Sequence, residues 1–242
     1  MPSIVNVLVV GVSEGQHWPS HCSTSPRAEL NVSLLSRDGS VHGGFPNIRV
    51  FQTDYSEASL AQACKGQDAI VSTMSALATM TQTKIINAAI VNGVKRYNPS
   101  DFGLNTSDMS SIAENLPALY QRLKPKKQIL DYLEEKASQS PEFTWTAIGA
   151  APLFGWTLKS GFLGTSVPNR TSTIIDSENE AYTTTTIPHI ARAIVGVLQK
   201  PNLTANKYLL VTSFQTTQNQ ILDTAERVTG QKFEVTRVNA ET

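Results

Sequence analysis

Short apolar runs recur along the first 150 residues, each followed by a stretch of polar or helix-forming residues. The run at 4–10 (IVNVLVV) is almost unbroken and β-branched, which is typical of a strand buried on both faces of a parallel sheet. Similar runs predict strands at 31–35, 47–51, 69–73, 94–97 and 144–148. Between the runs, apolar residues at helical spacing predict helices at 59–64, at 82–92, and from Pro125 or Lys126 to Ala137.

This alternation predicts an α/β fold, a doubly wound parallel sheet of Rossmann type over residues 1–151. Residues 152–242 are less regular and predict a smaller second lobe, interleaved with the first. We expect that lobe to hold a β segment at 172–175, helices at 187–199 and 218–229, and a strand at 207–211. A strand at 233–238 comes four residues before the end of the sequence, so the lobe is expected to be truncated at its C-terminus.

Composition narrows the class of protein. The chain has 242 residues, 40% hydrophobic and 17% charged, and its 20 basic residues balance its 20 acidic ones. The basic cluster of Lys124, Lys126 and Lys127 is too short for a nucleic-acid surface. Two cysteines (Cys22 and Cys64) and four histidines provide neither a disulfide framework nor a metal site. Without a basic leader or an apolar run of membrane length, we expect a cytoplasmic protein with no membrane association.

The turn after the first strand is the expected nucleotide-binding loop. A Rossmann turn uses glycines for the tight turn, for backbone approach to phosphate and for close helix packing. In GVSEGQH at 11–17, Gly11 occupies the first position, but Glu14 and His17 occupy the later glycine positions of a GxxGxxG spacing. The segment 16–28 contains two prolines, each costing about 3 kcal/mol inside a helix, so the first helix is expected to be weak.

The predicted cofactor contacts lie at the ends of four strands. They are Gly11, Ser13 and Gly15 in the turn, Arg37, Thr73 and Ser100. Arg37 follows the second strand, where a cation accommodates the 2′-phosphate of NADP(H). Asp38 next to it is the kind of residue that NAD(H) prefers, and a solvated loop arginine is the alternative without function.

The segment GVKRYNPSDFG at 93–103 resembles the GVKRFIPSEFG signature of NmrA-like and isoflavone-reductase-like proteins, atypical members of the short-chain dehydrogenase/reductase superfamily. Fungal members of that group are also similar at 7–11, 31–37, 143–148, 158–164, 187–201 and 205–222. The resemblance covers nearly the whole chain apart from 12–28. It implies a reductase that uses NADPH on a small, often aromatic molecule; whether the protein forms homo-oligomers is left open.

The resemblance also implies a lysine general acid/base on the helix before the sixth strand. Lys126 fits a KxxxxxxIE-like pattern best, with Leu133 and Glu134 seven and eight residues on, and Lys127 is the alternative. Hydride transfer needs a proton partner, and a lysine beside a bound cation has its pKa lowered toward neutrality. Solvated charges on the first helical turn are the alternative without function.

Tyr120 and Lys124 form a literal YxxxK, the dyad of short-chain dehydrogenases. Pro117 and Pro125 bracket it and are expected to leave little helix to hold that geometry, so we interpret the match as coincidence.

Three departures from the family pattern leave alternatives open. The glycine loop is altered, Ala150 stands where relatives carry an asparagine, and relatives continue well past a segment like FEVTRV. The normal length but altered residue types of 12–28 are what two compensating frame shifts would leave, a hypothesis that the transcript sequence tests. The aromatic residues Phe154, Trp156 and Phe162 are more often core than pocket. A non-catalytic NAD(P)-sensing regulator and a defective product therefore remain the alternatives to a reductase.

Overall fold

The computed structural model describes residues 3–11, 30–39, 48–176 and 179–239. The chain divides into two compact units. The first comprises Met1–Gly149 and Ala191–Leu210, and the second comprises Ala150–Ile190 and Val211–Thr242. Each unit is therefore built from two separate stretches of the chain.

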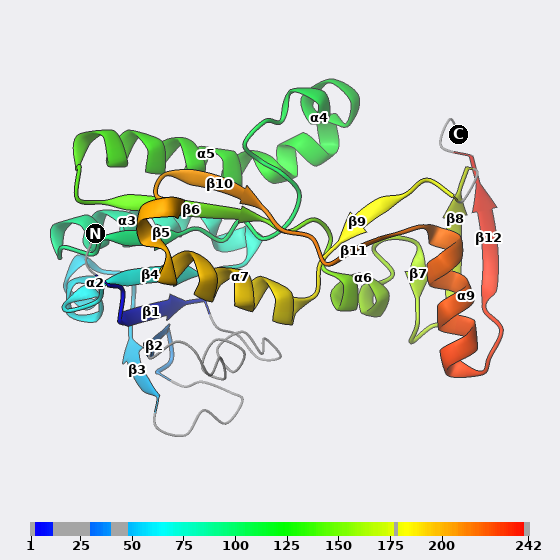
Figure 1. The fold of residues 1–242 in the computed structure, drawn as a ribbon, viewed down its shortest axis with the longest axis horizontal. Coiled ribbons are helices and arrows are strands. Elements are labelled where there is room, and N and C mark those ends of the chain that lie inside the picture. Colours follow the sequence, from blue (N-terminus) through cyan, green and yellow to red (C-terminus); the bar gives the residue numbers. More distant parts are fainter. Residues whose placement is uncertain (1–2, 12–29, 40–47, 177–178, 240–242) are drawn as a thin grey trace. The chain divides into compact units, whose positions relative to one another are not determined.

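The first unit contains a parallel sheet of seven strands in the order β10-β6-β5-β4-β1-β2-β3 (Figure 1). The strands are β1 (Asn6–Val10), β2 (Asn31–Ser36), β3 (Arg49–Gln52), β4 (Ala69–Ser72), β5 (Arg96–Asn98), β6 (Thr144–Gly149) and β10 (Lys207–Leu210). The order turns back on itself between β1 and β4, which is the switch point of a doubly wound sheet. The predicted Rossmann-type fold is confirmed.

Helices cover both faces of this sheet. They are α2 (Glu57–Cys64), η1 (Ala76–Thr81, a 3-10 helix), α3 (Gln82–Val91), α4 (Ser110–Asn115), α5 (Pro117–Gln139), α7 (Ile187–Gln199) and α8 (Pro201–Thr204). Alternate strand residues point to opposite faces, and Leu8 and Val10 share one core with buried residues of α2, α3 and α5. The part of α7 in this unit lies on the other side of the sheet from α5 (Figure 1).

Helix α5 differs from its prediction. It begins at Pro117 rather than at Pro125 or Lys126 and runs through Pro125 to Gln139. The expectation that the two prolines leave little helix around Tyr120 is therefore wrong. Pro117 stands in the first turn, where no backbone donor is needed, and the buried residues Leu130 and Leu133 hold the later turns on the sheet. The tertiary packing of α5 thus outweighs the local cost of one interior proline.

The loops that follow β1 and β4 approach each other closely. The Thr73 backbone N–H and side-chain hydroxyl both donate to the Val10 carbonyl, at 2.7 and 3.0 Å. Gly11 has a φ of +88°, and a methyl group built on it would lie 2.7 Å from the Met74 nitrogen and α-carbon. Only a glycine fits here, both because of its backbone conformation and because Met74 occupies the space.

A buried glutamine at the start of α3 organises the loop that follows β5. The Gln82 side-chain oxygen accepts from the Ser100 backbone N–H at 3.1 Å and from the Tyr97 hydroxyl at 3.3 Å. Its amide nitrogen donates to the Thr79 carbonyl at 3.2 Å. Because Gln82 is almost fully buried, no solvent is at hand to replace these bonds.

The second unit combines short strands with two helices. Its elements are α6 (Phe154–Ser160), β7 (Thr165–Ser166), β8 (Thr171–Ile175), β9 (Tyr182–Thr184), β11 (Phe214–Thr216), α9 (Gln218–Thr229) and β12 (Glu234–Val238). The strands form the sheets β12-β8-β7 and β11-β9. Helix α9 begins with a capping box between Thr217 and Gln220 and ends at Gly230. Leu222 and Phe233 pack with Ile174 in the core of this unit.

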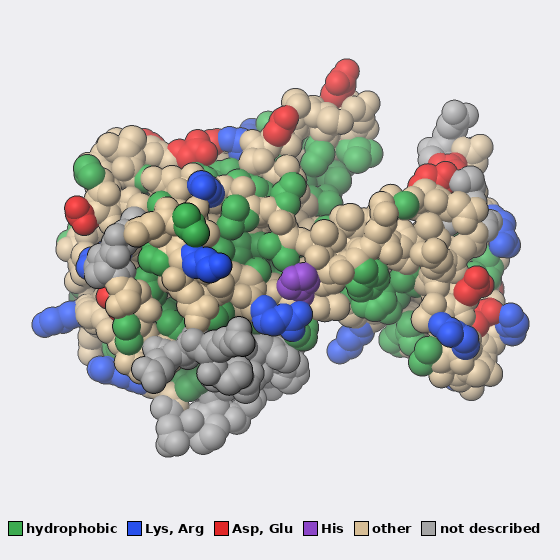
Figure 2. Space-filling model, in the orientation of Figure 1, with side chains coloured by type: hydrophobic (Ala, Val, Ile, Leu, Met, Phe, Trp, Pro, Cys, Tyr) green, Lys and Arg blue, Asp and Glu red, His purple; other side chains and the backbone are tan. Residues whose placement is uncertain are grey.

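Figure 2 shows acidic and basic side chains scattered over the visible face, without a large patch of one sign. Across the described segments of the chain, no helix combines the length and the apolar character that crossing a bilayer requires.

We predict that Gly11→Ala is strongly destabilising. A positive φ costs a residue with a side chain about 1–2 kcal/mol, and the contact with Met74 adds to that cost, so the free energy of unfolding should fall by about 3 kcal/mol or more. The matched control is Gly93→Ala, because Gly93 has a φ of +76° but open space around it. Urea denaturation measures both. Equal losses in the two variants would contradict a close approach at Gly11.

We predict that Gln82→Met, which keeps the shape of the side chain, lowers the free energy of unfolding by about 2–4 kcal/mol, since it leaves buried donors and an acceptor without partners. Thr83→Ala is the control, because it removes only an exposed hydroxyl bond to Met80 in the adjacent position. A Gln82→Met variant as stable as wild type in the same denaturation assay would show that the buried bonds contribute little.

Candidate functional site

Three predicted cofactor residues lie together at one edge of the sheet. Gly11 follows β1, Thr73 follows β4 and Ser100 is two residues beyond β5. These strands are neighbours in the order β5-β4-β1 and run parallel, so their carboxyl ends meet at the same edge. The crevice outside the carboxyl ends, at a switch point, is the general ligand position of such sheets.

The hydroxyl groups at this edge are already used in the protein's own structure. The Thr73 hydroxyl donates to the Val10 carbonyl, and the Ser100 hydroxyl donates to the Met74 carbonyl at 2.7 Å. Each hydroxyl oxygen retains lone pairs that can accept a hydrogen bond. The two residues therefore fix the loops, and can offer a ligand an acceptor but no free hydroxyl proton.

Arg37 follows β2, the strand next to β1, and its side chain is exposed. The neighbouring Asp38 carboxylate accepts a hydrogen bond from the Ser36 hydroxyl at 2.6 Å. Burial raises the pKa of Tyr55, and the nearby Arg37 guanidinium opposes that rise. Next to the switch point, the exposed cation of Arg37 is thus set beside an acid that already has a partner.

The other two predicted contacts, Ser13 and Gly15, lie outside the described residues, as does the predicted weak helix. The glycine loop therefore stays a prediction.

Lys126 is a half-buried residue of α5 that approaches the loop after β5. A methyl group built on Gly103 would lie 3.6 Å from the Lys126 Nζ. The loop that carries Ser100 on the cofactor side thus also meets the predicted general acid. Lys127, the alternative, forms an ion pair with Asp131 one turn along the helix.

A buried acid in the same loop was not among the predicted site residues. Asp101 is 3% exposed, and its Oδ2 accepts from the Thr106 hydroxyl at 2.6 Å. Burial raises the pKa of Asp101, and the Lys126 charge opposes that rise. Burial likewise lowers the pKa of Lys126, and Asp101 opposes that fall. An acid just after a buried strand, inside the 93–103 signature, was the available sequence signal.

Tyr208 on β10 completes this cluster. Its hydroxyl accepts from the Thr106 backbone N–H at 3.0 Å. A methyl group built on Gly149 would lie 2.9 Å from the Tyr208 Oη, so the glycine at the end of β6 leaves room for the phenol. More than one hundred residues separate Tyr208 from Thr106, and spacing along the sequence could not have linked them.

The YxxxK pair lies in continuous helix, contrary to its prediction. Tyr120 is half-buried and Lys124 is exposed on α5. Within the described part of the chain, neither residue forms a hydrogen bond or an ion pair with the Asp101 cluster.

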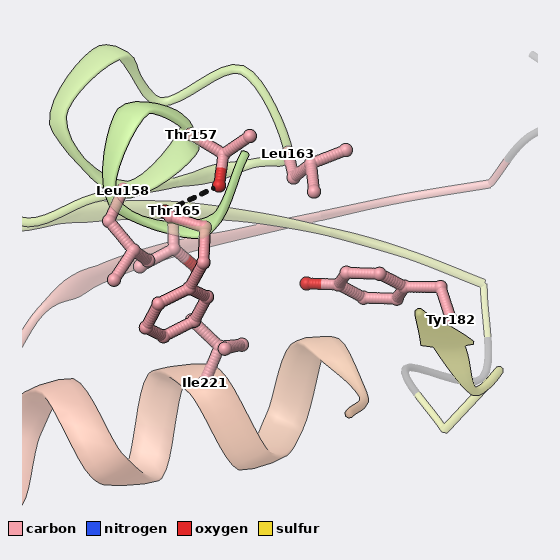
Figure 3. Close-up of a pocket in the computed structure, with 7 residues that line it drawn as sticks. Thr157, Leu158, Leu163, Thr165, Tyr182 and Ile221 are labelled. Carbon is pink, nitrogen blue, oxygen red and sulfur yellow. Dashed lines mark hydrogen bonds between the residues drawn. The ribbon is translucent and has the colours of Figure 1, made fainter. Parts of the chain in front are cut away.

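The second unit contains a small cavity lined by Phe154, Thr157, Leu158, Leu163, Thr165, Tyr182 and Ile221. Figure 3 shows the Tyr182 hydroxyl pointing toward the other labelled side chains. The cavity has room for about one water molecule, so it is too small for an organic substrate. In the first unit, a larger groove between α2 and α3 is lined by Lys84, Val91 and neighbouring residues and contains none of the predicted site residues.

The chain is similar in sequence to known proteins of one family. A profile of the NmrA-like family matches residues 28–242. Oxidoreductase poxI of Penicillium oxalicum is 31% identical over 217 residues, which cover 89% of this chain and 68% of that protein. Oxidoreductase aprR of Aspergillus flavus is 30% identical over 241 residues, which cover 98% of this chain and 78% of that protein.

Solved structures share the fold. A crystal structure of isoflavone reductase has a TM-score of 0.77 at 20% identity, covering 99% of this chain and 80% of that one. AtPrR2 with NADP+ and (+)pinoresinol has a TM-score of 0.77 at 21% identity, covering 100% of this chain and 81% of that one. The binary complex of leucoanthocyanidin reductase with NADPH, from Vitis vinifera, has a TM-score of 0.75 at 16% identity, covering 98% and 78%. The chain belongs to the NmrA-like family and has the fold of the isoflavone-reductase-like reductases.

Proposed function

We propose that this chain is an NADPH-dependent reductase that acts on a small molecule by hydride transfer, with Lys126 as the proton donor. The observation that carries the proposal is the loop after β5, which brings Ser100 to the carboxyl edge of the sheet and Gly103 beneath the Lys126 amine. The sheet edge that would bind the dinucleotide and the lysine that would donate the proton are therefore connected by one loop of the first unit. Two fungal relatives bear the name oxidoreductase, which supports the same reaction class.

The described residues fit a dinucleotide at several points. Gly11 directly follows β1, at the first position of the turn that approaches the pyrophosphate in a Rossmann fold. Arg37 provides an exposed cation after β2 for a 2′-phosphate, which favours NADPH over NADH. AtPrR2 with NADP+ and leucoanthocyanidin reductase with NADPH share this fold, which agrees with that choice.

When bound, NADPH supplies the hydride, and the substrate atom that gains the electron pair then needs a proton. Lys126 can donate it from its ammonium form. Burial lowers the pKa of Lys126, so proton transfer costs less than from an ordinary lysine, while the Asp101 charge keeps the amine protonated. The chain therefore contributes orientation at the sheet edge and one proton at Nζ.

We further propose an aromatic or otherwise apolar substrate. In the second unit, the Trp156 and Phe162 rings lie 5.2 Å apart, and both are about half exposed. Such exposed rings are a reason to test aromatic compounds first. Phe154 packs edge-on against Phe214 at 5.0 Å. (+)Pinoresinol in the AtPrR2 complex gives the size class. A cytoplasmic location is part of the proposal, in keeping with a sequence whose two cysteines provide no disulfide framework.

The cofactor choice predicts that the protein binds NADPH saturably and more tightly than NADH, as measured by quenching of tryptophan fluorescence. Arg37→Ala should weaken NADPH binding by about 10- to 100-fold and leave NADH binding within about threefold, because only NADPH carries the 2′-phosphate. Lys65→Ala removes another exposed cation of the same unit and should change neither. A folded protein that binds neither nucleotide would contradict the proposal.

The proton donor predicts that Lys126→Met lowers turnover by about 100-fold or more with NADPH affinity kept, as expected on loss of a general acid. Wild-type turnover should fall as the pH rises through the lowered pKa of Lys126, because only the ammonium form donates. Lys127→Met is the control and should stay near wild type. A panel of aromatic ketones and conjugated alkenes, followed by NADPH absorbance, provides the test. NADPH binding without reduction of any compound would favour a non-catalytic sensor.

A further inference from the structure

Asp101 carries a buried carboxyl group that is only half satisfied. Its Oδ2 accepts the Thr106 hydroxyl at 2.6 Å, while its Oδ1 is buried without a hydrogen-bond partner in the described chain. A buried carboxylate is costly unless a charge or further donors compensate it. The Lys126 Nζ reaches the same loop two residues further on, 3.6 Å from a methyl group built on Gly103, and brings an opposite charge to it.

The loop that carries Asp101 is held rigidly. Ser100 is fixed on one side by the Met74 carbonyl and by Gln82. Thr106 is fixed on the other side, because its backbone N–H donates to the Tyr208 hydroxyl. Asp101 between them is therefore a fixed charge, and its position does not depend on solvent or on a flexible side-chain stem.

The other charged residues on the elements around Lys126 are exposed or already paired, so they do not provide a buried counter-charge for its amine. On α5, Lys127 is paired with Asp131, and Arg122 and Lys124 are exposed cations. On α4, Glu114 is exposed. On α3, Lys84 is exposed, and η1 and β6, which also pack against α5, carry no charged residue. The titratable groups of the buried cluster are Asp101, Lys126 and Tyr208.

We propose that Asp101 is the positioning residue of the reaction: its buried carboxylate, fixed by Thr106 in the loop that the Lys126 amine approaches, supplies the negative charge that keeps Lys126 in the form of an acid. The role rests on the function proposed above, in which Lys126 donates the proton. Asp101 itself donates no proton to the substrate. It acts through Lys126 by favouring the ammonium form in a site where burial favours the neutral amine.

Competitive labelling with trace acetic anhydride tests this directly, because only the free amine reacts. The labelled fraction of Lys126 is followed against pH by mass spectrometry, with Lys127 in the same peptide as internal reference. In Asp101→Asn, the Lys126 titration should move about one pH unit or more toward acid, since loss of a nearby opposite charge has that size. Lys127 should follow the same curve in both proteins.

Two variants serve as controls. Asp101→Glu retains the charge and should return the Lys126 titration toward wild type. Asp108→Asn removes an exposed carboxylate from the same loop, where it accepts hydrogen bonds from Ser110. This change should leave the Lys126 titration unchanged. A wild-type Lys126 titration in folded Asp101→Asn overturns the proposal, and so does an equal shift in Asp108→Asn.

If Asp101→Asn does not fold, Thr106→Val decides. It removes the hydroxyl that stabilises the Asp101 carboxylate and keeps the backbone bond to Tyr208, so Lys126 should shift in the same direction by a smaller amount. Thr106→Ser should not shift it. An unchanged Lys126 titration in Thr106→Val overturns the proposal. Labelling needs neither cofactor nor substrate, so failure of the proposed reductase activity is a separate result from failure of this one.

Discussion

The contact between the loops after β1 and β4 determines where everything else at the sheet edge lies. The Val10 carbonyl takes two hydrogen bonds from Thr73, and the missing side chain at Gly11 lets Met74 come against the backbone. Met74 in turn accepts the Ser100 hydroxyl and so links the loop after β5 to the first two. A bulkier residue at Gly11 would separate these loops and displace the edge at which we place the dinucleotide.

Buried polar groups continue this arrangement away from the sheet edge. Gln82 holds Ser100, Tyr208 holds Thr106, and Asp101 lies in the same loop, which the Lys126 amine approaches at Gly103. Such a network costs desolvation energy that an apolar core would not. In exchange, it holds the loop after β5 in one defined arrangement. We infer that this desolvation cost is tolerated because the Lys126 amine must be both buried and charged.

The sequence predicted best where local pattern and tertiary structure agree. The β-branched runs became the inner strands, and α7 and α9 have the bounds that the sequence predicts, 187–199 and 218–229. Short elements such as α6 and β7 were missed because two to seven residues show no period. The start of α5 was misjudged because proline was weighed without the packing of Leu130 and Leu133.

The candidate site was only partly accessible to the same reasoning. Gly11, Arg37 and Lys126 follow from strand ends and from the family resemblance. The Asp101 cluster depends on Tyr208, which reaches the loop only because β10 pairs with β6 at the edge of the sheet. That pairing is set by the three-dimensional fold and could not be predicted from spacing along the chain.

A crystal structure of the chain with NADP+ would show whether the dinucleotide binds at the carboxyl edge of the sheet. We expect a dinucleotide along the carboxyl ends of β1, β4 and β5, with its 2′-phosphate at Arg37 and its nicotinamide ring facing the Lys126 amine. A dinucleotide bound elsewhere, a 2′-phosphate remote from Arg37, or an empty edge at saturating NADP+ would contradict it.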